Sequence, residues 1–212
     1  MSGILAYLVT AVGCLVGVAG AVVIIVALSK SRRRPAAPTS PTAADPFRDH
    51  DADALRGDPR RLRPGDLVEI RQVTYAVRGS LHLTEGGWSW DEHLLDTADG
   101  TKRWLSVEED PDLELVLWTA EPDATVTPGP QTVDFDGRRY RSDESGQATW
   151  TGTGTTGLAP TGSVRYHDYT ASGDARLSFE KYGDADWEVA RGELLRRPEV
   201  MVYPQAGPEK VG

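Results

Sequence analysis

The chain has 212 residues, a formal net charge of −9 and one cysteine. A single cysteine excludes a disulfide framework and a cysteine-based zinc site, and the acidic balance argues against a nucleic-acid-binding protein. Once the two N-terminal segments described next are set aside, about 150 residues remain, which is enough for one domain.

The N-terminal segment is apolar and uncharged from residue 4 to residue 28. As an α-helix this run extends ~37 Å, enough to cross a hydrocarbon core of ~30 Å. A cleaved signal peptide would have a basic start and a shorter apolar run, and neither is present. The sequence therefore predicts a retained transmembrane helix over residues 3–29.

Basic residues follow this segment directly, at Lys30, Arg32, Arg33 and Arg34. Because positive charge favours the cytoplasmic side, we expect a single-pass protein of the cell membrane with a cytoplasmic C-terminal domain. The same four side chains are expected to contact anionic lipid headgroups.

Small residues share one face of the predicted helix at a spacing of four, at Gly13, Gly17 and Ala21. This spacing lets two membrane helices approach closely and predicts a homodimer. The alternative is that such residues are simply common in membrane helices.

Residues 30–63 contain five prolines and no apolar periodicity, which predicts a basic, flexible tether. Residues 1–63 hold nine Lys and Arg against five Asp and Glu, whereas residues 64–212 hold 14 against 27. A basic stalk therefore carries an acidic head, which should attract basic partners or cations and repel nucleic acid. Residues 206–212 are expected to form a disordered tail.

The head, residues 64–205, shows short alternating runs separated by turn signals such as Gly86-Gly87 and Asp99-Gly100. Such signals predict antiparallel hairpins. The predicted fold class is mainly β: one transmembrane helix and a duplicated antiparallel β domain.

An internal repeat supports the duplication, because similar short motifs recur in the same order. Four pairs of motifs carry it: Val68–Tyr75 with Val133–Tyr140, Trp90 and Glu92 with Tyr166 and Asp168, Leu105–Glu108 with Leu177–Glu180, and Glu114–Trp118 with Glu199–Tyr203. We expect two similar units, about 66–119 and 132–204, packed as a sandwich or an open barrel. Ten of the fifteen residues in 149–163 are Thr or Gly, which predicts a long, loosely ordered loop.

The hairpin around Gly86-Gly87 carries the richest chemistry. A two-residue turn places Leu81 and Leu83 on one face with Trp88, Trp90 and Glu92. The other face then gathers His82, Asp91 and His93, with His167 as the histidine that the second unit offers. Two imidazoles and a carboxylate suit a divalent metal or an acid–base pair, and the alternative is a solvated polar face.

Glu92 and Asp168 occupy matching positions on the aromatic faces of the two units. A carboxylate on an apolar face needs a raised pKa or a specific donor, and Arg103, Arg165 or Arg176 is placed to supply one. A structural ion pair is the favoured interpretation over a catalytic pair. The sequence contains no G-x-S-x-G, P-loop or H-E-x-x-H motif, so neither an enzyme class nor a cofactor is assigned.

The head resembles the bacterial "domain of unknown function 4178" family. The resemblance rests on Gly65–Val68, Tyr75–Gly79, Trp90–Leu95, Arg103–Glu108 and Leu115–Trp118. It covers about residues 64–204 and implies a β-rich domain that works near a membrane, without established catalytic residues.

Three functions remain open. The favoured one is a membrane-anchored interaction or sensing module linked to membrane or envelope maintenance, with a protein partner. The second is a small-ligand or metal-binding domain, and the third is an enzyme using Glu92 and Asp168. The expected ligand-binding residues are His82, Trp88, Trp90, Asp91, Glu92, His93, His167 and Asp168.

Overall fold

The computed structural model describes Asp53 and residues 55–205 of the chain. The predicted membrane helix over 3–29, its face of Gly13, Gly17 and Ala21, the basic cluster of Lys30, Arg32, Arg33 and Arg34, and the predicted tail 206–212 lie outside the described residues. Within the described part, no helix combines the length and the apolar character needed to span a membrane.

The described residues form eleven strands and two short 3-10 helices, η1 and η2, so the mainly β prediction is confirmed. The first half contains η1 (Pro59–Arg61), β1 (Leu67–Ile70), β2 (Val73–Glu85), β3 (Trp88–Asp96), β4 (Arg103–Glu109) and β5 (Leu113–Ala120). The second contains β6 (Thr132–Phe135), β7 (Arg138–Gly154), β8 (Thr161–Thr170), β9 (Ala175–Tyr182), β10 (Glu188–Leu195), η2 (Arg197–Glu199) and β11 (Val200–Tyr203).

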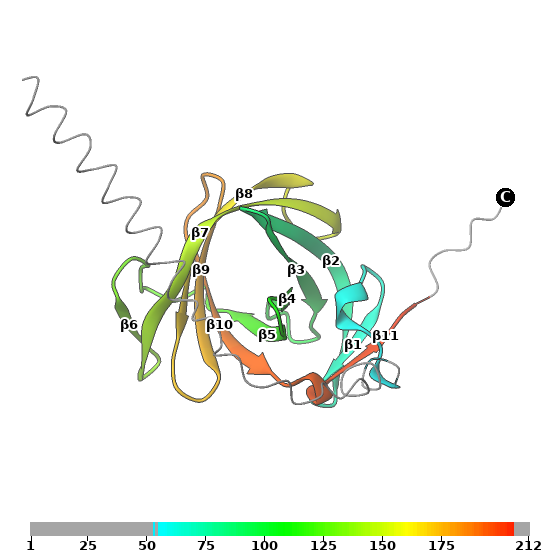
Figure 1. Ribbon diagram of the computed structural model, residues 1–212. Helices are drawn as coiled ribbons and strands as arrows, with labels where there is room; N and C mark the ends of the chain where they lie inside the picture. The colour runs from blue at the N-terminus through cyan, green and yellow to red at the C-terminus, as the bar shows by residue number, and fades with distance from the viewer. Residues whose placement is uncertain (1–52, 54, 206–212) are drawn as a thin grey trace, which may run out of the picture. The chain divides into compact units, whose positions relative to one another are not determined.

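All strands belong to one antiparallel sheet, and the sheet closes on itself (Figure 1). One edge of β2 pairs with β3 over Ala76–Glu85. The other edge pairs first with β1 and then, over Gly79–Thr84, with β7. The closed ring runs β2-β3-β4-β5-β10-β9-β8-β7. The expected sandwich or open barrel is therefore wrong, because the additional β2–β7 pairing closes these strands into a ring, with β1, β11 and β6 attached outside it.

The internal repeat is visible in the strand order. Across the sheet, β1 to β5 come in sequence order and are followed by β10 to β6 in reverse order. Each strand from β1 to β5 therefore has a counterpart in β6 to β10. The two halves meet in antiparallel pairs at β5–β10 and at β2–β7. The first three predicted motif matches fall on corresponding strands. The fourth match is wrong: Glu114–Trp118 lies in β5, whose counterpart is β10, whereas β11 returns to pair with β1. The second unit therefore ends near residue 195.

Side-chain alternation gives the sheet three apolar clusters. One lies inside the ring, where Leu81, Leu83 and Trp150 pack together. The other two lie on the outer side, where β1 with β11 and β6 with the start of β7 each cover neighbouring strands. Leu105 is fully buried in the cluster beneath β1 and β11, and Phe179 is fully buried in the cluster beneath β6 and β7. Each half thus buries apolar residues on both faces of its strands.

The Thr- and Gly-rich tract is ordered, which corrects the predicted loop. Residues 149–154 belong to β7 and pair with β2 and β8, leaving only 155–160 between strands. Thr is a good strand former because its branched side chain suits a pleated surface. Gly162 is required by packing, since a Cβ there would lie 2.3 Å from the ring of Trp150. The tract therefore closes the ring.

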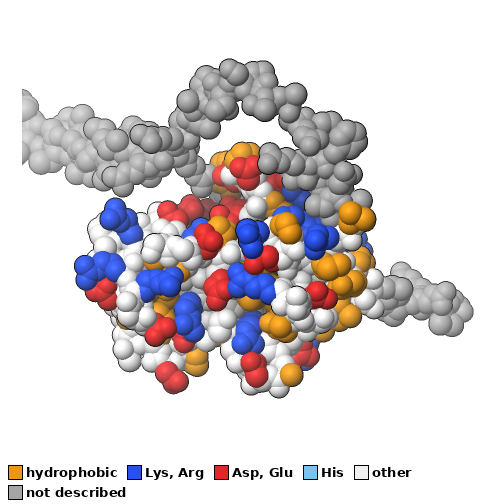
Figure 2. Space-filling model, turned by 90° about the horizontal axis from the view of Figure 1, so that it is seen from below, with side chains coloured by type: hydrophobic (Ala, Val, Ile, Leu, Met, Phe, Trp, Pro, Cys, Tyr) orange, Lys and Arg blue, Asp and Glu red, His pale blue; other side chains and the backbone are white. Residues whose placement is uncertain are grey.

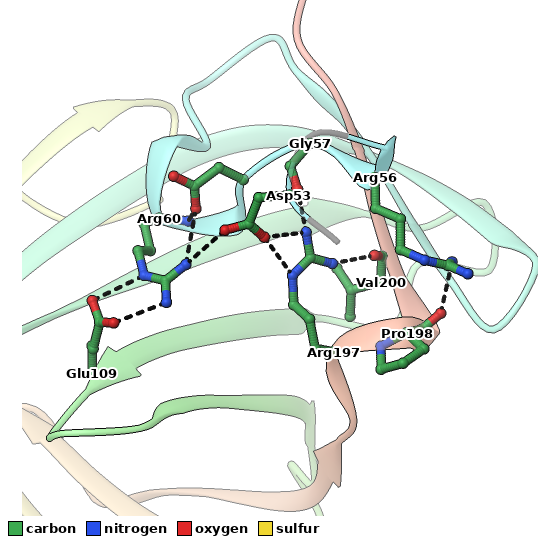
Figure 3. Close-up of polar contacts among 9 residues, drawn as sticks. Asp53, Arg56, Gly57, Arg60, Glu109, Arg197, Pro198 and Val200 are labelled. Atoms are coloured by element: carbon green, nitrogen blue, oxygen red, sulfur yellow. Dashed lines mark hydrogen bonds and ion pairs between the residues drawn. The ribbon is translucent and has the colours of Figure 1, made fainter. Parts of the chain in front are cut away.

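The last part of the predicted tether packs against the head (Figure 3). Asp53 accepts hydrogen bonds from Arg197 and from Arg60, and Arg60 also donates to Glu109 of β4. Leu62 is 6% exposed and joins the apolar cluster beneath β1. The ordered head therefore begins before residue 64, where the sequence placed its boundary.

Candidate functional site

The β2–β3 hairpin forms with the register predicted from the sequence. Leu81 pairs with Glu92 and Leu83 with Trp90, while His82 lies opposite Asp91 and Ser80 opposite His93. Alternation sends Leu81, Leu83, Trp90 and Glu92 into the ring. The hairpin therefore divides the expected ligand-binding residues between the interior and the outer surface.

A cavity of about 160 Å³ occupies the part of the ring interior that the apolar cluster does not fill. It is lined by aromatic and acidic side chains from both halves of the repeat. These are Trp90, Glu92, Trp104, Glu108, Glu114, Trp118, Asp143, Glu144, Tyr166, Asp168 and Glu180, together with Ser106, Ser178, Val116, Ala190 and Arg176. Seven carboxylates and a single arginine face it, so the cavity suits a cation.

Its deepest carboxylates are Glu92, Asp168 and Glu180. Burial raises the pKa of Glu92 well above its ordinary value, and the charges of Glu180 and Asp168 raise it further. Burial also raises the pKa of Glu180, and it raises that of Asp168 to about 8 against a hydrogen bond from Ser178. These acidic groups lie close enough to disfavour one another's ionised form, and a positive charge beside them would favour it.

Asp168 carries the least satisfied polar atom. Its Oδ1 is shielded from solvent and has no hydrogen-bond partner within the described residues. A buried acceptor without a partner costs about 1–3 kcal/mol, so this atom is a strong recipient for a donor supplied by a ligand.

The favoured ion pair between these carboxylates and an arginine is not formed. Arg103 pairs with Asp99, and Arg165 lies over the ring of Trp187. Arg176 reaches the cavity, but the hydrogen bond its guanidinium makes is to the backbone oxygen of Ala175. Glu92 instead accepts a hydrogen bond of 3.2 Å from the indole Nε1 of Trp90.

Aromatic rings form the walls of the cavity. Trp90 packs edge to face against Tyr166, with ring centroids 5.9 Å apart. The hydroxyl of Tyr166 donates to Glu85. The hydroxyl of Tyr182 donates a hydrogen bond of 2.9 Å to Glu180. The charge of Lys102, whose Nζ binds Glu188, partly offsets the raised pKa of Glu180. The walls are thus fixed by hydrogen bonds before any ligand enters.

The histidine face lies on the outside of the ring, separate from the cavity. His82 Nδ1 lies 2.8 Å from Asp91, and both side chains are open to solvent. His93 bonds Ser80 at 2.8 Å, and burial lowers its pKa to about 4, so it is neutral at pH 7. No group of three or more metal-ligating side chains is arranged around an ion site in the described part of the chain.

Two other expected ligand residues also lie away from the cavity. His167 packs against Trp187, with centroids 5.4 Å apart, and burial beside Arg165 lowers its pKa. Trp88 is 51% exposed at the hairpin turn. Of the eight expected residues, the cavity therefore brings together Trp90, Glu92 and Asp168.

Sequence reasoning missed Glu180 as a site residue. Both Glu108 and Glu180 line the cavity, but Glu108 is exposed whereas Glu180 is partly buried. The repeated Leu-Ser-x-Glu motif held the signal, because Ser178 pairs with Asp168 as Ser106 pairs with Glu92. No such signal marked Trp104, Trp118 and Arg176. Their side chains point into the cavity only because the ring closes.

Comparison with known proteins agrees with the resemblance. The model of the "Domain of unknown function (DUF4178)" family matches residues 63–197. Uncharacterized proteins of Mycobacterium bovis and of two strains of Mycobacterium tuberculosis are each 40% identical over 195 residues, covering 88% of this chain and 91% of the relative. No solved structure matches the chain. The chain therefore belongs to the DUF4178 family.

Proposed function

We propose that the head is a binding module for a small organic cation, held at the cell membrane by the N-terminal segment. The ligand enters the ring and places positive charge beside the acidic side chains of the cavity, among them Glu92 and Asp168. Binding converts the occupancy of this cavity into a signal for a protein partner, which makes the chain a sensing module.

The observation that carries this proposal is the unpartnered Oδ1 of Asp168 at the wall of an acidic cavity. A charged N–H donor satisfies this acceptor and neutralises the mutual repulsion of the buried carboxylates. Hydrogen bonds between charged groups are about twice as strong as neutral ones, and a space with few waters strengthens them.

The aromatic walls support the same chemical class. Trp90, Trp104, Trp118 and Tyr166 line the cavity. The face of an indole or phenol ring attracts a cation, by about 0.5–2 kcal/mol depending on how far the cation is desolvated. A neutral or anionic ligand of the same size gains neither this attraction nor the carboxylate contacts.

The membrane part of the proposal is supported by the uncharged run 4–28 and by the basic residues that follow it. We propose that residues 3–29 span the membrane once, that the head is cytoplasmic, and that Lys30, Arg32, Arg33 and Arg34 contact anionic headgroups. Gly13, Gly17 and Ala21 supply the contact face of a homodimer. Two reporters fused in turn after residue 212 test the orientation. One is active only in the periplasm, and the other is active only in the cytoplasm.

An enzyme that uses Glu92 and Asp168 is the second candidate, and one observation favours it. Both carboxylates line a single cavity, which is the geometric condition for paired acid–base chemistry, and both have raised pKa values. Mass spectrometry of a bound ligand after prolonged incubation separates the two functions: a binding module returns it unchanged.

Titration calorimetry on the full chain in detergent micelles tests the proposed function. The probes are n-butylamine, 1,4-diaminobutane, n-butanol and butyrate. We expect saturable binding of the amines and none of the neutral or anionic probes, with the heat lost in Asp168→Asn. Asp96→Asn, which removes an exposed carboxylate paired with Arg78, is the matched control. If no amine binds at millimolar concentration, the proposal is wrong.

A further inference from the structure

The internal repeat equips the cavity with two copies of one side-chain arrangement. In each half an aromatic residue pairs across the strands with a glutamate, and an acidic residue pairs with a serine. The pairs are Trp90 with Glu108 and Glu92 with Ser106 in one half, and Tyr166 with Glu180 and Asp168 with Ser178 in the other. All eight side chains line the same cavity.

The two copies approach the cavity from different sides of the ring. β3 and β4 carry one copy, and β8 and β9 carry the other (Figure 1). The pairs β2–β7 and β5–β10 separate them in the strand order. Because Trp90 and Tyr166 nevertheless touch, a ligand resting against these rings meets an acidic side chain from each half.

Each half of the repeat brings its own acidic side chain to this environment. Glu92 is buried in one half, and Asp168 and Glu180 are partly buried in the other. The Nζ of Lys102, whose charge lowers the pKa values of Glu92 and Glu180, is bound to Glu188 at 2.7 Å. The two halves therefore offer separate acidic groups, one from each side of the ring, to the cationic ends of a ligand.

We propose that the ligand is a short linear diamine, whose two ammonium groups contact Glu92 in one half and Asp168 in the other. This inference rests on the proposed function and names its ligand class. The carbon chain between the amines lies against Trp90 and Tyr166, where apolar surface is buried and the charged ends remain beside carboxylates.

The size of the cavity fits such a molecule. A cavity of about 150 Å³ accommodates benzene, which has six carbon atoms. The cavity here is about 160 Å³, which suits a chain of about six non-hydrogen atoms and therefore 1,4-diaminobutane. A much longer diamine has to leave one end in the exposed part of the cavity lining, which includes Glu108 and Glu144.

The test compares 1,4-diaminobutane with 4-amino-1-butanol, which has the same length and one charged end, by calorimetry on the full chain in micelles. We expect the diamine to bind at least about tenfold more tightly, as a second charge-assisted contact implies. Glu92→Gln and Asp168→Asn should each reduce this ratio to near one, and Asp96→Asn should preserve it.

Equal affinity of the two probes for the unaltered chain overturns the diamine assignment and leaves the proposed cation site standing. The absence of binding by either probe overturns both. Since this comparison is made on the unaltered chain, it is decisive even where a cavity variant fails to fold.

Discussion

Trp90 and Tyr166 meet edge to face inside the ring, with their centroids 5.9 Å apart and their planes at 72°. The two residues occupy equivalent positions in the internal repeat, so this contact joins the halves at the cavity wall. Because the two rings pack against each other, the contact fixes β3, which carries Glu92, relative to β8, which carries Asp168.

Removing this contact should destabilise the fold. Trp90→Ala is expected to lower the free energy of unfolding by about 2–4 kcal/mol, because it opens a void and breaks the aromatic pair. Urea unfolding of the full chain in micelles measures the change. Trp88→Ala is the control, since Trp88 is 51% exposed two residues away and its loss should cost about 0.5 kcal/mol or less. Equal losses would contradict the packing role.

The raised pKa of Asp168 predicts a fall in stability with rising pH. An aspartate normally titrates near 3.8, whereas burial raises this pKa to about 8 in the folded chain. Between these values the folded state binds more protons than the unfolded state, so the free energy of unfolding decreases as pH rises, by at most about 1.4 kcal/mol per pH unit.

Asp168→Asn removes this dependence, because an amide keeps the shape of the protonated acid. Urea titrations at several pH values from 5 to 8 should therefore show a flatter profile for the variant than for the unaltered chain. Glu92 contributes a slope of the same sign, so some dependence remains. An unchanged profile would show that Asp168 is not buried in the folded chain.

His93 should produce the opposite slope at lower pH. Burial lowers its pKa from 6.5 to about 4, so the unfolded state binds more protons in this window. Stability contributed by the neutral ring is present above pH 6.5 and is lost as pH falls towards 4. His93→Gln, which keeps a partner for Ser80, should reduce the loss on acidification in urea titrations; a steeper loss would contradict it.

The hairpin was predictable from sequence because its signals are local. Gly86-Gly87 fixes a two-residue turn, and period-two alternation then determines which side chains share a face. The equivalence of Glu92 and Asp168 was also visible, since both stand two residues after an aromatic residue in repeated motifs. What the sequence could not supply was the distance between the halves, which depends on pairings between residues more than 60 positions apart.

Closure of the ring was mispredicted for a physical reason. The Thr- and Gly-rich tract has no apolar alternation, and such composition is typical of loops. In the structure its threonines pair with β2, and Gly152 and Gly162 leave room for Leu81 and Trp150. The tract is therefore a strand because of what surrounds it. The same closure turns Glu180 inward and leaves His82 and His93 outside.

The segment 53–63 should detach when its main contact is lost. Arg197 donates to Asp53 at 2.8 Å and to the carbonyl oxygens of Gly57 and Val200. Arg197→Ala should lower stability by about 1–3 kcal/mol and expose the arginines of this segment to trypsin. Limited proteolysis measures the effect, and Arg139→Ala, which breaks an exposed pair with Asp134, is the control. Equal cleavage of both variants would contradict the role of Arg197.

Gly162 provides the sharpest test of the closed ring. Any side chain there meets the indole of Trp150, because an added Cβ would lie 2.3 Å from it. Trp150 lies inside the ring, is 6% exposed and donates to the carbonyl oxygen of Ala159, so it has little freedom to move.

Gly162→Val should therefore lower the free energy of unfolding by about 1–3 kcal/mol through overpacking. It should also change the fluorescence of the folded chain as the indole is displaced towards solvent. Thr161→Val, at the exposed neighbouring position, should leave both quantities close to those of the unaltered chain. If the two variants behave alike, residues 149–154 do not pack as a strand against the ring interior, and β2 and β7 do not close the sheet.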